Sequence, residues 1–70
     1  MKKLLISTDR DISKKNDPVW CSDVFAKVEH LIIDNSTLIL RCNRMDDMIP
    51  EVKKIELLNG GTLTLTERDM

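Results

Sequence analysis

EVKKIELLNGGTLTLTE, residues 51–67, is the stretch of this sequence that decides the predicted fold. Apolar and polar residues alternate on both sides of Asn59-Gly60-Gly61, and this glycine-rich composition is typical of a hairpin loop. With a loop of these residues, the cross-strand pairs are Leu57 with Leu63 and Ile55 with Leu65. One face of the hairpin is then apolar throughout, so the alternation predicts an antiparallel β-hairpin.

The segment VEHLIIDNSTLIL, residues 28–40, repeats this pattern with a shorter turn at Asn35-Ser36. Both segments read V-x-x-[LI]-x-[IL]-x-N, then small residues, then T-L-x-L. The repeat makes these residues equivalent: Val28 and Val52, Leu31 and Ile55, Ile33 and Leu57, Leu38 and Leu63, Leu40 and Leu65. It predicts a second hairpin with the same inward set, in which Leu31 and Ile33 face Leu40 and Leu38.

The two hairpins and one further strand predict a mainly β fold for a single domain over residues 1–70. Its architecture is a small antiparallel sheet or a partly open barrel. The further strand is Lys2–Ser7, whose apolar residues on both sides indicate a covered position. Residues 8–18 are polar and predict a surface loop. Residues 45–51 are expected to form at most one short helix.

Helical periodicity leaves a second topology open. Val24, Val28 and Leu31 lie on one stripe of a helix, and Asp47 is placed to cap another helix that ends at Asn59-Gly60. The alternative is an α+β fold in βαβαβ order, with helices near 23–33 and 47–58. The repeat and the β-branched content favour the hairpins.

The charges of the chain nearly balance, with 11 Lys and Arg against 12 Asp and Glu. This balance excludes a strong overall field that would steer the protein to nucleic acid or to a membrane surface. The opening MKKLLI has an apolar run too short for a signal peptide or a spanning helix. We therefore expect a cytoplasmic chain without membrane contact, in which Cys21 and Cys42 are reduced thiols. In an oxidising compartment these two cysteines could pair instead.

No group of residues has the spacing that catalysis or metal binding requires. His30, Cys21 and Cys42 form neither a CxxC nor an HxxxH pair, and the hairpin register sets His30 opposite Arg41 as a polar neighbour. Gly60-Gly61 lacks the surroundings of a phosphate-binding loop. The sequence predicts no catalytic, cofactor-binding or metal-binding residue, and a chain that is not an enzyme.

The first hairpin differs from the second on its outward face. Ile32 and Ile39 stand where the second hairpin has Glu56 and Thr64, so the first hairpin is apolar on both sides. Either residues 18–27 or another molecule should cover this face. We expect a non-enzymatic protein-binding module, a small inhibitor or adaptor that contacts a larger protein or forms a homodimer. The predicted partner-binding residues are Trp20, Ile32, Ile39 and Arg41.

The C-terminal strand offers a further way to bind a protein. If it is an edge strand, its free N–H and C=O groups can accept a strand from a partner or from a second copy. Only Glu67, Arg68 and Asp69 supply charge against such pairing.

The alternative function is a small dimeric regulator that binds nucleic acid through local basic residues. The residues of this alternative are Lys14, Lys15, Arg41, Arg44, Lys53 and Lys54. Nearby acidic residues and the scarcity of aromatic side chains weigh against it.

Overall fold

A computed structural model describes residues 2–66 of the chain. The helices and strands follow one another in the order β1 (Lys3–Ile6), β2 (Arg10–Ile12), η1 (Trp20–Val24), η2 (Phe25–Lys27), β3 (His30–Asp34), β4 (Thr37–Arg41), α1 (Met45–Met48), β5 (Lys54–Leu58) and β6 (Thr62–Thr66). Here η1 is a π-helical turn and η2 a 3₁₀ turn.

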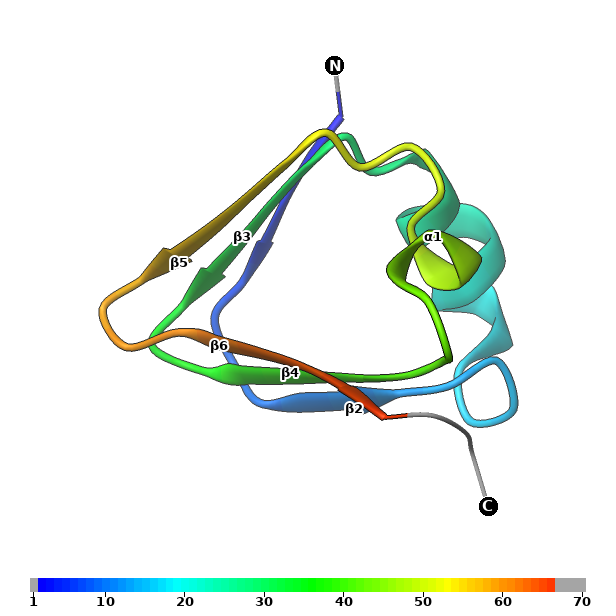
Figure 1. Cartoon of the computed structure of the whole chain (residues 1–70), viewed down its shortest axis with the longest axis horizontal. Coiled ribbons are helices and arrows are strands. Elements are labelled where there is room, and N and C mark those ends of the chain that lie inside the picture. The colour runs from blue at the N-terminus through cyan, green and yellow to red at the C-terminus, as the bar shows by residue number, and fades with distance from the viewer. Residues whose placement is uncertain (1, 67–70) are drawn as a thin grey trace.

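The strands form two parallel sheets of three strands each, in the orders β1-β3-β5 and β2-β4-β6. Consecutive strands turn a corner from one sheet to the other, and the helical segments return the chain along a third side (Figure 1). The result is a short parallel β-helix. We call β1 with β2 the first coil, β3 with β4 the second coil, and β5 with β6 the third coil.

The predicted antiparallel sheet and its hairpins are therefore wrong. β3 and β4 lie in different sheets, as do β5 and β6. The two strands of each predicted hairpin therefore do not pair with each other. A hairpin and a solenoid coil both need alternating inward residues around a tight bend, which is why the pattern fits either. The stacked arrangement is more stable because stacked coils enclose a continuous apolar interior, whereas an isolated hairpin buries little apolar surface.

The repeat itself is confirmed in an unexpected role. Its equivalent residues lie side by side in neighbouring coils: Leu31 beside Ile55, Ile33 beside Leu57, Leu38 beside Leu63, and Leu40 beside Leu65. Residues that are equivalent in the two copies of the repeat are therefore partners in neighbouring, stacked strands. The first coil contains a third copy, with Leu4 and Ile6 beside Leu31 and Ile33, which the comparison of two hairpin patterns does not reveal.

Other predicted elements have mixed outcomes. The first strand and the short helix near residues 45–51 are confirmed by β1 and α1. The expectation of at most one short helix is wrong, because η1 and η2 are helical as well. The first strand is not covered on both sides, because it is an edge strand and Leu5 is exposed. The predicted loop over residues 8–18 contains β2, whose Ile12 is buried.

The βαβαβ alternative is also wrong, because β3 and β5 occupy the last part of each of its helical ranges. Helical structure does occur over η1 and η2, which begin before the range 23–33 and overlap its first five residues. Asp17 accepts a hydrogen bond at Oδ1 from the Trp20 N–H at 3.3 Å, and Pro18 begins the helical turn. This capping pair is a sequence signal for the helix.

The bends that join the two sheets use left-handed backbone at equivalent asparagines. Asn35 and Asn59 both have a φ of 51°, a conformation that asparagine tolerates better than most residues. The Asn35 N–H donates to the Leu58 carbonyl at 2.9 Å, which joins the two bends. A Cβ atom on Gly61 would lie 2.1 Å from the Ile33 carbonyl oxygen, so this position requires glycine.

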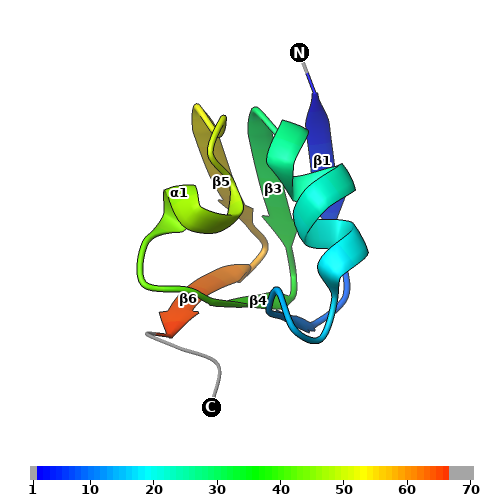
Figure 2. The same cartoon turned by 90° about the vertical axis from the view of Figure 1, so that its right-hand side faces the viewer.

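The core lies inside the triangle formed by the two sheets and the helical side (Figures 1 and 2). Its buried apolar residues are Ile6, Ile12, Phe25, Val28, Leu31, Ile33, Leu38, Leu40, Cys42, Met48 and Ile49. Within residues 2–66, no helix combines the length and the apolar content needed to span a membrane.

Candidate protein-binding surface

The inward side chains form ladders along the stack. In the second coil these side chains are completely buried. Leu31, Ile33, Leu38 and Leu40 are each 0% exposed. Each has a neighbour from the first coil on one side and from the third coil on the other. The two ends of the stack can therefore be compared position by position.

The end formed by the first coil is closed. Ile6 and Ile12 are 2% exposed, although no strand of the described chain lies beyond them. Arg10, in register with Leu38, places its guanidinium 4.1 Å from the centre of the Trp20 ring. Trp20 packs against the core and meets Phe25 edge-on, with ring centres 5.4 Å apart. The Trp20 ring covers part of the core at the closed end, and the Arg10 guanidinium lies on the ring through a cation–π contact.

The end formed by the third coil is open in the described chain. Leu57 is in register with Ile33 but is 52% exposed, and Leu65 is in register with Leu40 but is 41% exposed. Ile55 and Leu63 beside them are half-buried. We call Ile55, Leu57, Leu63 and Leu65, with the outer edges of β5 and β6, the open end.

The open end also presents backbone hydrogen-bonding groups. β5 and β6 are the last strands of their sheets, so each has one edge without a strand partner among residues 2–66. The condition for strand addition to the C-terminal strand is met, because β6 is an edge strand among the described residues. The charges expected to protect it, Glu67, Arg68 and Asp69, lie outside the described residues.

The predicted binding pair Ile32 and Ile39 does not form one surface. Ile32 lies between Leu5 and Glu56 on one sheet, whereas Ile39 lies between Asp11 and Thr64 on the other. Both are half-buried. The expectation that both residues share one outward face follows from pairing β3 with β4 in a hairpin. It is wrong because these strands belong to different sheets. A shallow hollow of about 240 Å³ does reach Ile39, lined also by Asp9, Arg10, Asp11 and Thr37.

The other two predicted partner-binding residues have structural contacts. Trp20 belongs to the closed end, with one ring face beneath Arg10. Arg41 donates from Nε and Nη2 to the two carboxylate oxygens of Asp11, each at 2.7 Å. This pairing with Arg41 lowers the pKa of Asp11, chiefly through the hydrogen bonds. The structure thus separates the four predicted residues over several faces.

The basic residues of the nucleic-acid alternative mostly have acidic neighbours. Besides Arg41, the ion pairs are Arg44 with Asp46 at 3.2 Å, Lys53 with Glu29 at 3.7 Å and Lys54 with Glu56 at 3.7 Å. Lys14 and Lys15 lie in the turn after β2. His30 meets Glu56 at 2.5 Å rather than Arg41, because β3 pairs with β5. Local acids offset the positive charge, and nucleic-acid binding stays a prediction.

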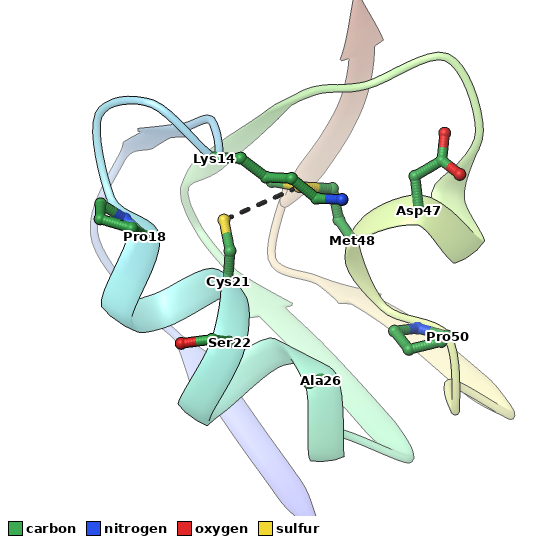
Figure 3. A pocket seen from close by; sticks show the side chains of 8 residues that line it. All are labelled: Lys14, Pro18, Cys21, Ser22, Ala26, Asp47, Met48 and Pro50. Atoms are coloured by element: carbon green, nitrogen blue, oxygen red, sulfur yellow. Dashed lines mark hydrogen bonds between the residues drawn. The ribbon is translucent and has the colours of Figure 1, made fainter.

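A groove of about 360 Å³ runs between the helical segments on the third side (Figure 3). It is lined by Lys14, Pro18, Cys21, Ser22, Ala26, Asp47, Met48 and Pro50. The Cys21 thiol donates to the Met48 sulfur at 3.8 Å. Burial raises the pKa of the Cys21 thiol, and Asp17 raises it further. The thiol is therefore protonated at neutral pH and poorly suited to act as a nucleophile.

The second cysteine has the same character. Burial raises the pKa of Cys42, and the Asp47 carboxylate adds to the effect. Both thiols are free. Over residues 2–66 no cluster of three or more His, Cys, Asp or Glu side chains is placed to hold a metal ion. The groove therefore provides shape and apolar surface without an evident reactive group.

The strongest surface feature, the open end, was only partly predicted from the sequence. The sequence suggests edge pairing by the C-terminal strand on the condition that this strand is an edge. It does not predict the exposure of Leu57 and Leu65, since the hairpin register buries both. The signal that could have found it is the third copy of the repeat in KLLI, residues 3–6, because three copies indicate a stack with two ends.

No protein-family model, no curated protein and no solved structure matches this chain.

Proposed function

We propose that this chain is a non-enzymatic protein-binding module whose binding surface is the open end. The observation that carries the proposal is the contrast at equivalent inward positions, where Ile6 is 2% exposed and Leu57 is 52% exposed. Inward positions of a stack are apolar because each coil buries them against the neighbouring coil. A partner that covers Leu57 and Leu65 would remove apolar surface from water, the main favourable term in protein association.

The edges of β5 and β6 favour a partner that supplies strands. Strand addition satisfies backbone N–H and C=O groups at a sheet edge, while side-chain contacts select the partner. The outward residues of β6 are Thr62, Thr64 and Thr66, which are neutral and suit strand geometry. An inhibitor or adaptor role is consistent with such a surface, because blocking or bridging requires contact rather than chemistry.

The proposal is tested by affinity capture from extract of the native cell, followed by mass spectrometry. The test variant is Leu57→Lys at the open end, and its matched control is Leu5→Lys on the outer side of β1, where the exposed fraction is similar, 57% against 52%. Circular dichroism and urea unfolding first establish that both variants fold. We expect partners retained by the unmodified chain to be kept by Leu5→Lys and lost by Leu57→Lys.

Equal retention by both variants would place binding elsewhere on the molecule and contradict the proposal. Failure of the unmodified chain to retain any partner, its own copies included, would also contradict it.

A further inference from the structure

We infer that the partner of the open end is a second copy of this chain, bound open end to open end about a twofold axis through the bend at residues 59–61. This inference rests on the proposed function, since it names the partner for the same surface. Two features of the described chain favour a second copy: the chemistry of the two ends and the directions of β5 and β6. The size of the end face limits the affinity.

The closed end is unsuited to stack on the open end. Continuing the register of the first sheet would set Lys54 of one copy beside Lys3 of the next, as both pair with His30 within one chain. Like charges directly opposite each other destabilise strand pairs. In the second sheet, Leu63 would meet Arg10, whose guanidinium already lies over Trp20. Head-to-tail stacking into a fibre is therefore disfavoured.

The open end, in contrast, is complementary to itself. β5 runs toward the bend at residues 59–61 and β6 runs away from it. A twofold axis through this bend sets β5 of each copy antiparallel to β6 of the other, so all four outer edges find partners.

The side chains match in this arrangement. Residues at equal distance from Gly60 meet, so Leu57 faces the partner's Leu63 and Ile55 faces the partner's Leu65. On the outside, Glu56 and Lys54 face threonines, Thr64 and Thr66 respectively. No like charges meet, and every inward pair is apolar.

The size of the end face fits a dimer of modest affinity. The described chain measures 30 × 24 × 18 Å along its principal axes, and Figure 1 looks down the shortest of these, onto the triangular outline of the stack. A triangular face within 30 by 24 Å covers about 360 Å² in projection, less than the roughly 800 Å² that each partner buries in a standard interface. The paired strand edges add hydrogen bonds, so we expect self-association that depends on concentration.

Sedimentation equilibrium over a wide concentration range tests the inference, with Leu57→Lys as the test variant and Leu5→Lys as the control. We expect a monomer–dimer equilibrium for the unmodified chain and no change of the dissociation constant in Leu5→Lys. In Leu57→Lys we expect the constant to rise by about 10- to 100-fold, because both copies lose an apolar contact.

A dimer that Leu5→Lys weakens and Leu57→Lys does not would overturn the inference, as would a series of longer oligomers. Leu65→Asp provides a second test variant at the open end, should Leu57→Lys fail to fold. In an equal mixture of ¹³C-labelled and unlabelled chains, isotope-filtered NMR should show contacts between the Leu57 and Leu63 methyl groups of different copies. A dimer without these contacts would contradict the twofold arrangement.

A monomer at all concentrations would overturn the inference while leaving the proposed function open to its own test. If that monomer retains another protein from extract, and Leu57→Lys abolishes the retention, the open end binds a different partner. If the monomer retains nothing, both proposals fail.

Discussion

Ile6 and Leu57 occupy the same inward position in the first and third coils, yet Ile6 is buried and Leu57 is half exposed. Ile12 and Leu65 repeat the contrast in the other sheet. Strand pairing alone does not create the difference, because both coils lie at an end of the stack. The difference arises from what lies across each end.

The first coil is followed by seventeen residues, 13–29, that return the chain along the third side and place Trp20 and Phe25 against the core. The third coil has no corresponding cover among the described residues. Solenoid repeats bury their apolar faces against neighbours, and terminal repeats need a separate cap. The comparison teaches that this chain contains its own cap at one end and presents stacking surface at the other.

The largest expected effect comes from separating the third coil from the second. In Gly61→Ala the new methyl group meets the Ile33 carbonyl oxygen, so the two bends must move apart. We expect a loss of about 4 kcal/mol in the free energy of unfolding, measured with urea. Gly60→Ala is the control: nothing lies within 4 Å of its Cβ, and only its φ of 82° is unfavourable. It should cost about 1 kcal/mol, and equal losses would contradict the close approach of the bends.

The second effect compares one ladder position in two coils. Leu40→Ala removes a fully buried side chain and should cost about 3 kcal/mol in the free energy of unfolding. Leu65→Ala, at the same position in the third coil, should cost about 1 kcal/mol when measured at concentrations where the chain is monomeric, because Leu65 is already partly in water. Urea unfolding of both variants checks this order. A larger loss for Leu65→Ala would show that the third coil is not an exposed end.

The third effect opens the closed end. Arg10→Ala removes the guanidinium from the Trp20 ring, and we expect a loss of about 1 kcal/mol in the free energy of unfolding. The same variant should shift Trp20 fluorescence to longer wavelength, because water reaches the ring. Lys15→Ala, at an exposed position in the turn after β2, is the control. An unchanged emission spectrum would mean that Arg10 does not shield Trp20.

The smallest effect concerns the ion pair between the first two coils. The pKa of Asp11 in the folded chain lies below its usual value because Arg41 hydrogen-bonds to the carboxylate. The pair therefore stabilises the fold above about pH 4, and the contribution is lost as pH falls through the lowered pKa. We expect Asp11→Asn to lower the urea midpoint slightly near neutral pH, with a difference that shrinks in acid. A difference that grows in acid would contradict this sign.

The sequence alone predicted much of what a single coil needs. The inward identities of Ile55, Leu57, Leu63 and Leu65 were correct, since alternation has the same period in a hairpin and in a coil. Neighbouring strands could not be predicted correctly in this way, because alternation does not show whether Leu57 lies beside Leu63 or beside Ile33. That choice depends on whether the chain reverses or turns a corner at Asn59, which its left-handed backbone alone does not decide.

The candidate site was harder to predict for a related reason. Ile32 and Ile39 are predicted as binding residues because their outward positions are apolar. Both are half-buried, however, whereas the inward residues Leu57 and Leu65 at the end of the stack are exposed. Local pattern cannot show that Leu57 is exposed, because its environment depends on whether a further coil follows. Glu56 illustrates the same limit, since it contacts His30, a residue of the neighbouring coil that is 26 positions away in sequence.

Residue-resolved amide hydrogen exchange, followed by NMR at low and at high protein concentration, tests the contrast between the two ends most directly. We predict that β3 and β4 amides are protected at both concentrations, and that β1 and β2 amides exchange at rates independent of concentration. Amides on the outer edges of β5 and β6 should exchange rapidly in the monomer and become protected as the dimer forms. Concentration-dependent protection at β1 and β2, or equal protection of β5 and β6 at both concentrations, would contradict the account.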